Sequence, residues 1–254
     1  MTVHLTEQAI TRFREYEPPE GYYLAFSGGK DSIVIYDLAI RSGVRFDAHF
    51  HATTVDPPEV LQFIKKHYSK VSWEKPKNSM FKLIVKHRIL PTRAIRYCCR
   101  ALKEIGGKNR LIVTGIRWAE SAKRRKRQMY EQSRHNKKTW FLHPIIDWTD
   151  QDVWDYIRSE SLAYCSLYDE GQTRIGCIMC PMQGTRGMLL DAERYPKYYK
   201  AYLITFGKML DAIRANGRVF KHGSTPEEVM YWWIYGKDLD TATVQKVLKE
   251  DGHV

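Results

Sequence analysis

The chain has 254 residues, and its hydrophobic fraction of 43% and aromatic fraction of 13% are typical of a folded globular protein. No apolar run is long enough to cross a bilayer, and residues 1–20 are too mixed and charged for a signal peptide, so we expect a cytoplasmic protein without a membrane partner. Lys and Arg number 41 against 29 Asp and Glu, and the net charge of +12 favours a polyanionic partner.

Helical and extended patterns alternate along much of the chain. A helix within residues 1–20 ends at Pro18-Pro19, and a strand at 22–26 leads through a glycine loop into a helix over 31–41 that Ser42-Gly43 stops. We then expect strands at 44–54, 71–73, 111–114 and 140–146, and helices that open at 56–59 and cover 79–87, 100–105, 149–159, 187–215 and 225–236.

Strands that alternate with helices at this spacing predict an α/β fold with a doubly wound parallel sheet. We expect residues 1–185 to form this nucleotide-binding domain and residues 186–254 to form a helical C-terminal extension. Ligands of such sheets bind at the carboxyl ends of the strands. Three loops at such ends should therefore converge on one crevice, and they contain Ser27, Thr54-Val55-Asp56 and Gly115-Ile116-Arg117.

The glycine loop after the first strand has the sequence Ser27-Gly28-Gly29-Lys30-Asp31-Ser32. Its glycines allow a tight turn and let a ligand approach the main-chain N–H groups, while Lys30 and the helix N-terminus favour an anion. The spacing is not that of the P-loop, GxxxxGK[ST]. The loop indicates a phosphate or pyrophosphate site, and the simpler alternative is a glycine turn before a helix.

The five cysteines are the adjacent pair Cys98-Cys99, the motif Cys177-x-x-Cys180 and the isolated Cys165. An odd number argues against a disulfide framework. Four thiolates can hold zinc or an iron–sulfur cluster, and the adjacent pair together with Pro181 favours a [4Fe–4S] cluster over Zn²⁺. We expect the paired cysteines to be metal ligands and Cys165 to be a buried thiol.

Lys and Arg crowd residues 123–138, where Glu131 is the only acid. This segment predicts a mobile loop or hairpin that follows the phosphate backbone of DNA or RNA. Trp118, Tyr130 and Trp140 are close enough in sequence to stack on bases. The alternative is a solvated loop that closes over a small anionic nucleotide.

Four further segments carry a family resemblance, and they are Arg96–Lys103, Gly115–Ser121, Pro144–Trp148 and Arg174–Pro181. The glycine loop resembles the PP-loop motif SGGxDS. Together with it, these segments resemble the phosphoadenylylsulfate (PAPS) reductase family of the PP-loop ATP pyrophosphatase superfamily, in particular its iron–sulfur branch, over about residues 20–185. The resemblance implies an adenine nucleotide alpha-hydrolase-like fold. It also implies nucleotide binding by Ser27, Gly28, Gly29, Lys30, Asp31, Ser32, Asp56, Gly115 and Arg117, and cluster binding by Cys98, Cys99, Cys177 and Cys180.

The chain departs from the sulfonucleotide reductases because no cysteine follows Cys180, and Gly252-His253 lack the nucleophilic thiol that the resemblance implies beside them. ATP pyrophosphatases that sulfurate DNA or tRNA account best for the PP-loop, the cysteines and the charge together. A PAPS or adenylylsulfate reductase, an ATP sulfurylase small subunit and a non-enzymatic iron–sulfur module that binds nucleic acid are the alternatives.

On this interpretation, ATP is hydrolysed to AMP and pyrophosphate to activate a substrate, which we expect to be nucleic acid, for sulfur transfer. The PP-loop and Lys30 would hold the departing pyrophosphate, with Mg²⁺ bridging the phosphates. Asp31 would cap the following helix or contact the metal through water, and Arg117 would neutralise the α-phosphate. Lys30, Asp31 and Arg117 are thus the candidate catalytic residues, and a cysteine desulfurase is a candidate sulfur donor.

Overall fold

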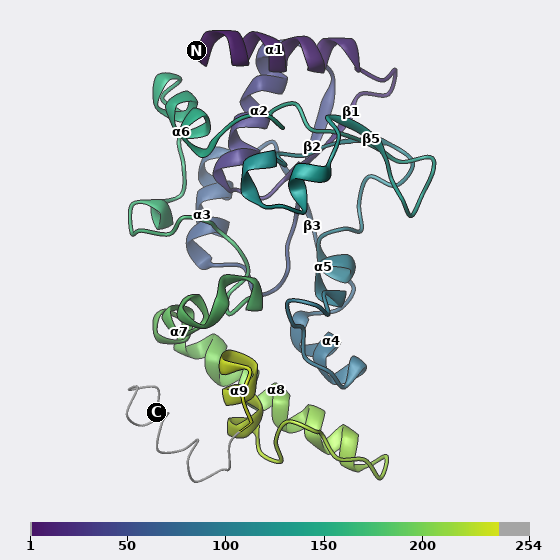
Figure 1. The fold of residues 1–254 in the computed structure, drawn as a ribbon, viewed down its shortest axis with the longest axis vertical. Coiled ribbons are helices and arrows are strands. Elements are labelled where there is room, and N and C mark those ends of the chain that lie inside the picture. Colours follow the sequence, from purple (N-terminus) through teal and green to yellow (C-terminus); the bar gives the residue numbers. More distant parts are fainter. Residues whose placement is uncertain (1, 239–254) are drawn as a thin grey trace. The chain divides into compact units, whose positions relative to one another are not determined.

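Six strands form one sheet around β1 (Tyr22–Phe26), the first strand that the sequence predicts (Figure 1). The structure is a computed structural model that describes residues 2–238. β1 pairs in parallel with β2 (Phe46–His51) on one side and with β4 (Leu111–Val113) on the other. The remaining strands are β3 (Ser72–Glu74), β5 (Tyr130–Gln132) and β6 (Trp140–Leu142).

The strand order β3-β2-β1-β4-β6-β5 confirms the predicted α/β class. All neighbouring strands are parallel except β5 and β6, which form an antiparallel hairpin at one edge. The order reverses between β1 and β4, and this switch point is where such sheets bind ligands. The loops that follow β1 and β4 therefore lie where a ligand is expected.

Local sequence signals set the ends of the helices. α2 (Lys30–Ser42) ends at Gly43, whose φ of 72° lets its N–H donate to the Ile40 carbonyl. α6 (Asp150–Ser159) begins with the predicted capping box of Thr149 and Asp152. The other helices are α1 (Thr2–Glu15), α3 (Pro58–His67), α4 (Met80–His87), α5 (Tyr97–Leu102), α7 (Gly184–Arg194), α8 (Pro196–Arg214) and α9 (Pro226–Tyr235), with short 3-10 turns η1 (Trp118–Glu120), η2 (Arg124–Lys126), η3 (Ser166–Tyr168) and η4 (Pro181–Gln183).

Several predicted boundaries are wrong. The helix expected at 100–105 is α5, so the adjacent cysteines lie inside a helix rather than before it. The strands expected at 44–54 and 140–146 end at His51 and Leu142. β6 ends at Leu142 because a turn follows it, in which the Ile146 N–H donates to the His143 carbonyl at 3.2 Å. Of the two expectations for 123–138, the hairpin is correct.

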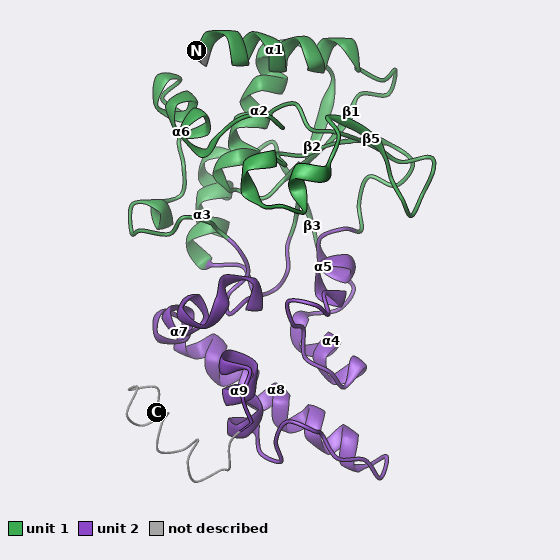
Figure 2. Cartoon of the chain, viewed as in Figure 1, with its two compact units in different colours: residues 1–51, 58–75, 105–175 green, residues 52–57, 76–104, 176–254 purple. Residues whose placement is uncertain are grey.

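The chain divides into two compact units that interleave along the sequence (Figure 2). Unit 1 comprises residues 1–51, 58–75 and 105–175 and contains the whole sheet, and α1, α2 and α6 pack on one another within it. Unit 2 comprises residues 52–57, 76–104 and 176–254. It has its own helical core, in which Tyr202, Phe206 and Trp233 are buried.

The domain boundary expected at residue 185 would divide the chain only once, and it stays a prediction. Gly252-His253 lie outside the described residues. Within residues 2–238, no helix combines the length and the apolar character that crossing a membrane requires.

Candidate nucleotide site and its surroundings

The PP-loop, Ser27–Ser32, is held in a tight turn by its own side chains. The Ser32 hydroxyl donates to the Gly29 carbonyl at 2.7 Å and accepts from the Ser27 N–H at 3.2 Å. Gly28 has a φ of 73°, and a Cβ there would lie 3.0 Å from Ile64 on α3. A side chain at this position would therefore be strained by backbone conformation and by contact, which explains the glycine.

The turn leaves main-chain donors for an anion at the N-terminus of α2. Among the described residues, no acceptor lies against the N–H groups of Gly28 and Asp31. The Lys30 N–H donates to the Tyr168 hydroxyl at 2.9 Å. The N-cap is Gly29 without a side-chain bond, so the expectation that Asp31 caps this helix is wrong. The helix start is thus open to an external acceptor.

Asp31 instead pairs with Arg117, which joins the loops after β1 and β4. The Arg117 Nε donates to the Asp31 carboxylate at 2.7 Å, and one terminal nitrogen donates to Asp150 at 3.0 Å. A third bond runs to the Trp148 carbonyl at 3.3 Å, and the Arg117 residue is only 2% exposed. Its guanidinium is therefore committed to holding two carboxylates in place.

Gly115 allows this pairing because it lies against Asp31. A Cβ on Gly115 would stand 2.8 Å from the Asp31 Cβ and 3.0 Å from its backbone. Burial raises the pKa of the Asp31 carboxyl above its ordinary value, while Arg117 and Lys30 act in the opposite direction. A carboxyl with a perturbed pKa at the switch point of the sheet is a feature of functional sites.

The Lys30 ammonium faces a segment that returns after α6. It lies 3.1 Å from the Asp150 carboxylate and donates to the Thr173 carbonyl at 3.0 Å. The ring of Tyr168 lies 5.6 Å from the same nitrogen. Burial raises the pKa of Tyr168, so its hydroxyl keeps its proton, and no described residue accepts that proton. The Tyr168 hydroxyl is therefore a spare donor beside the PP-loop.

The structure thus adds Asp150, Tyr168 and Thr173 to the residues that the sequence indicated. Asp150 could have been found, because it is the first residue of a helix with a recognised capping box. Nothing in the sequence marks the other two. Cys165 is 1% exposed, as expected, and lies close enough to Tyr168 for a thiolate charge to raise the pKa of that hydroxyl.

Asp56 lies in unit 2, whereas the PP-loop lies in unit 1. Its buried carboxylate accepts from the Thr53 N–H at 2.5 Å. The PP-loop and the loop that carries Arg117 are therefore joined as expected, and the participation of Asp56 in the crevice stays a prediction.

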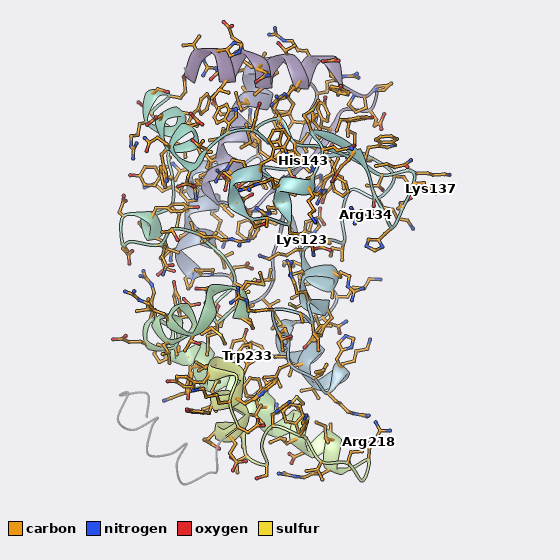
Figure 3. The ribbon with its side chains drawn as sticks, viewed as in Figure 1. Lys123, Arg134, Lys137, His143, Arg218 and Trp233 are labelled. Atoms are coloured by element: carbon orange, nitrogen blue, oxygen red, sulfur yellow. The ribbon has the colours of Figure 1, made fainter. Side chains whose placement is uncertain are left out.

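Residues 123–138, the cationic segment, are anchored at one end and free at the other. Arg124 pairs with Glu120, and Arg127 pairs with Glu131, so the nearby acids are already neutralised. The remaining Lys and Arg side chains are exposed and have no ion-pair partner in the described part of the chain. They are Lys123, Arg125, Lys126, Arg134, Lys137 and Lys138. Figure 3 shows Lys137 extending outward from the end of the hairpin.

The anchor of this segment is the buried His143, which is labelled in Figure 3. Its Nδ1 lies 2.7 Å from the Thr114 hydroxyl, and its Nε2 lies 3.3 Å from Arg127 and 3.5 Å from Glu131. Burial, together with the charge of Arg127, lowers the pKa of His143 to about 4. The neutral imidazole therefore joins the hairpin to the end of β4.

Two of the three aromatic residues expected to stack on bases already stack on each other. The Tyr130 and Trp140 rings lie 4.9 Å apart at 16°, and Tyr16 stacks on Tyr130 at 4.5 Å. Both faces of Tyr130 are therefore occupied. Trp118 is 39% exposed, and its indole N–H donates to the Arg127 carbonyl at 2.8 Å. This side chain keeps a surface that a base could contact.

The four paired cysteines belong to unit 2 and influence one another. The pKa of the Cys98 thiol is raised by its side-chain hydrogen bond with Cys99, by burial and by charge on Cys177 and Cys180. Arg96 donates a hydrogen bond to the Cys99 sulfur at 3.4 Å. The hydrogen bonds of Cys98 and Arg96 with Cys99 lower the pKa of the Cys99 thiol. Within residues 2–238, no three His, Cys, Asp or Glu side chains stand in an arrangement that could hold a metal ion.

Comparisons with known proteins place this geometry in context. Residues 21–183 match the family model of the phosphoadenosine phosphosulfate reductase domain. The chain is 32% identical over 190 residues to an uncharacterised protein of Methanocaldococcus jannaschii, covering 70% of this chain and 46% of that protein. It is 27% identical to the adenosine 5'-phosphosulfate reductase of Staphylococcus haemolyticus over 66% of this chain and 72% of that enzyme.

A solved structure supports the fold. The phosphoadenylyl-sulfate reductase of Candida auris, in a phosphate complex, superposes with a TM-score of 0.52 at 20% identity, covering 69% of this chain and 93% of that one. Likeness at this identity concerns the fold alone. The chain spans less than half the length of the archaeal relatives that it matches at 32% identity.

Proposed function

Because the chain belongs to the phosphoadenosine phosphosulfate reductase domain family, we propose that it is an enzyme that binds an adenine nucleotide at the PP-loop. The observation that carries this proposal is the convergence of donors at the start of α2. The N–H groups of Gly28 and Asp31 and the Tyr168 hydroxyl are donors without an acceptor among the described residues, and the Lys30 ammonium, which pairs with Asp150, belongs to the same loop. A phosphate group would satisfy them together.

We propose ATP as this nucleotide and AMP and pyrophosphate as the products. An acceptor oxygen, or water when no acceptor is bound, would attack the α-phosphorus, and the bond to the bridging oxygen would break as pyrophosphate leaves. Attack by water gives AMP directly, whereas an adenylated acceptor releases AMP when sulfur displaces it. Lys30 would exchange the Thr173 carbonyl for the leaving group and offset its growing charge. The other proposed nucleotide-binding residues are Ser27, Gly28, Gly29, Asp31, Ser32, Asp56, Gly115 and Arg117.

The ion pairs refine the proposed roles of the three catalytic candidates. Lys30 would contact the phosphates directly. Arg117 would act as a positioning residue, because its guanidinium already holds Asp31 and Asp150. The Asp150 side chain is 63% exposed, and with Asp31 it offers the oxygen ligands that Mg²⁺ prefers. These two carboxylates would hold the metal beside the phosphates.

We propose that nucleic acid is the acceptor. The cationic segment supports this, because its one acid, Glu131, and the nearby Glu120 are paired with Arg127 and Arg124, while six cations stay exposed and unpaired among the described residues. A single bound nucleotide carries too few charges to need them. A phosphate backbone would use them through the release of condensed counterions.

The cysteines support a sulfur step. Cys98, Cys99, Cys177 and Cys180 all lie in unit 2, and the Arg96 and Lys103 cations act on them. Four thiolates are the donor set of a [4Fe–4S] cluster, with Zn²⁺ as the alternative, but the described side chains would have to move together to hold either group. Bound there, the cluster would supply a site for sulfide or a structural cross-link. A sulfur-donor protein such as a cysteine desulfurase would provide a persulfide whose outer sulfur displaces AMP from the adenylated acceptor. A cysteine thiol would then reduce the resulting disulfide and release the thiolated acceptor.

One observation favours a second candidate, a sulfonucleotide reductase. Cys165 lies near Tyr168 and therefore near the PP-loop, where an enzyme thiosulfonate could form. Its 1% exposure argues against this role, because an attacking thiolate needs access to the substrate. Incubation with adenylylsulfate and trapping of a thiosulfonate at Cys165 would support the reductase.

The proposed activity is tested by product analysis. Purified protein with Mg·ATP should release AMP and pyrophosphate, and nucleic acid should increase the rate. Lys30→Met should abolish release, whereas Lys200→Met, at an exposed lysine of α8, should leave it unchanged. Release of ADP and phosphate instead would contradict the mechanism. Anaerobic purification with an iron and sulfide assay would separate the cluster from zinc.

A further inference from the structure

Unit 2 contains a second group of cations, in a different part of the sequence from the cationic segment. Residues 76–103 contain eight Lys and Arg and no Asp or Glu. This stretch covers α4, the loop after it and α5, and the two helices contact each other within unit 2 (Figure 1). Two short helices can form without such a bias, so helix formation does not explain why this stretch lacks Asp and Glu.

Part of this charge has a structural explanation. Lys86 lies in the last turn of α4, where the helix dipole favours a cation. Arg96 donates to the Cys99 sulfur, and charge on Cys177 and Asp56 raises the pKa of Lys103. Arg88 adopts a left-handed conformation at the end of α4. The charge or conformation of these four residues therefore has a role within unit 2.

The other four cations make no such contacts, although one of them, Arg100, stands in the last turn of the six-residue helix α5. They are exposed, and no described residue pairs with any of them; we call them the cationic strip, and they are Lys77, Lys82, Arg93 and Arg100. On α4, Lys82 opposes the buried face formed by Met80, Leu83 and Ile84. It also stands one turn from Lys86, and like charges at this spacing disfavour a helix. The arrangement is unfavourable in the free protein and is relieved by an anion.

We propose that the cationic strip of unit 2 is a second contact surface for the phosphate backbone of the nucleic acid acceptor. This inference rests on the proposed function in taking nucleic acid as the acceptor. A polymer of phosphates is the partner that fits, because the stretch combines exposed cations that have no ion-pair partner among the described residues with a complete lack of acids, and a polyanion offers repeated charges to match them. The surface also lies in the stretch that contains Cys98 and Cys99, so it would bind acceptor in the unit that holds the thiols.

The test compares two sets of four substitutions with the same change in charge. The strip variant replaces Lys77, Lys82, Arg93 and Arg100 with Ala. The matched control replaces exposed lysines of unit 2 outside the acid-free stretch, Lys197, Lys200, Lys208 and Lys221. Binding of a labelled 30-nucleotide DNA strand, and of RNA with the same sequence, is measured against salt concentration with the full-length protein.

Each backbone contact that is lost should reduce the slope of log K against log salt by about 0.7 for a single strand. The strip variant should therefore lose about 2 to 3 from this slope, whereas the control should keep it. Equal losses in both variants, or no loss in either, would overturn the proposal. Displacement of the nucleic acid by polyglutamate of equal charge would overturn it as well, in favour of an acidic protein.

Release of AMP from ATP without nucleic acid separates this inference from the proposed function. The strip variant should retain that basal release, because its residues lie outside the PP-loop. Loss of binding with intact release supports the strip. A wild-type protein that binds nucleic acid through the strip and releases no AMP would contradict the proposed function alone. Far-ultraviolet circular dichroism checks that both variants are folded.

Discussion

The PP-loop region and the tip of the cationic segment, both in unit 1, differ in whether their charged side chains form ion pairs within the described chain. Around the PP-loop, Lys30, Asp31, Arg117 and Asp150 form a chain of ion pairs, and the Arg117 residue is 2% exposed. At the tip of the hairpin, Arg134 and Lys137 stand in solvent without partners in the described chain (Figure 3). The charged side chains around the PP-loop are therefore held in place before any ligand binds, whereas those at the tip of the hairpin are not.

This difference matches two kinds of anion. A pyrophosphate leaving group needs donors at fixed positions, because preorganised groups stabilise charge without rearranging during the reaction. A phosphate backbone needs charge density rather than fixed geometry, because its binding energy comes largely from released counterions. The contrast therefore predicts large effects of single substitutions near the PP-loop and small, additive effects at the hairpin.

The sharpest test of this contrast is Arg117→Ala. Removing a buried guanidinium leaves Asp31 and Asp150 without their partner, and we expect a loss of about 3 kcal/mol in the free energy of unfolding. AMP release should fall by about a hundredfold, since a displaced Asp31 would disorder the site. Urea unfolding and product analysis measure the two quantities.

Arg158→Ala is the matched control. Arg158 also pairs with an acid of α6, Asp155, but its side chain is 65% exposed. An exposed pair contributes about 0.5 kcal/mol or less. Equal effects of the two substitutions would show that burial does not distinguish the PP-loop network from the protein surface.

The sequence revealed the parts of the site that carry local signals. The PP-loop stands between a strand and a helix, Gly115 and Arg117 follow a buried strand, and Thr149 begins a capping box. Tyr168 could not be found, because it reaches the Lys30 N–H across 138 residues from a loop without periodicity. Long-range contacts of this kind depend on the tertiary path rather than on neighbouring residues.

The same limit explains why the sequence did not reveal that Tyr130 and Trp140 stack on each other. Both are aromatic residues in a basic segment, which is the pattern of a nucleic-acid surface. The antiparallel register pairs Tyr130 with Leu142 and Gln132 with Trp140, so the two aromatic side chains lie diagonally across the hairpin and meet. Their contact depends on a strand register that sequence spacing alone did not supply.

A pH series tests whether the root of the hairpin is as rigid as the PP-loop region. His143 has a pKa of about 4 in the fold, below its ordinary value, so protons bind more readily to the unfolded chain between about pH 4 and 6.5. The free energy of unfolding should therefore fall by about 2 kcal/mol between pH 7 and 5. Urea unfolding at several pH values measures this loss.

His143→Gln should remove most of this pH dependence. The groups that face the imidazole are Thr114, Arg127 and Glu131, and the pair of Arg127 with Glu131 would persist in the variant. His135→Gln changes an exposed histidine of the same segment and should leave the dependence intact. A pH dependence that survives in His143→Gln would assign it to another group.

The smallest expected effect concerns Tyr168, at the boundary between fixed and free donors. Tyr168→Phe removes the hydroxyl that accepts from the Lys30 N–H and that has no acceptor of its own among the described residues. If that hydroxyl donates to a phosphate oxygen, the variant should bind inorganic pyrophosphate about tenfold more weakly, a loss of about 1.4 kcal/mol. Isothermal titration calorimetry measures this affinity without requiring turnover.

Tyr164→Phe is the control, because the Tyr164 hydroxyl donates to Asp169 at 2.9 Å rather than contacting the PP-loop. Its pyrophosphate affinity should equal that of the wild type. Tighter binding by Tyr168→Phe would reverse the interpretation, because the hydroxyl would then compete with phosphate for the Lys30 N–H. In that case the segment around Tyr168 and Thr173 would act as an internal substitute for the anion, and the PP-loop would be less open than its free N–H groups indicate.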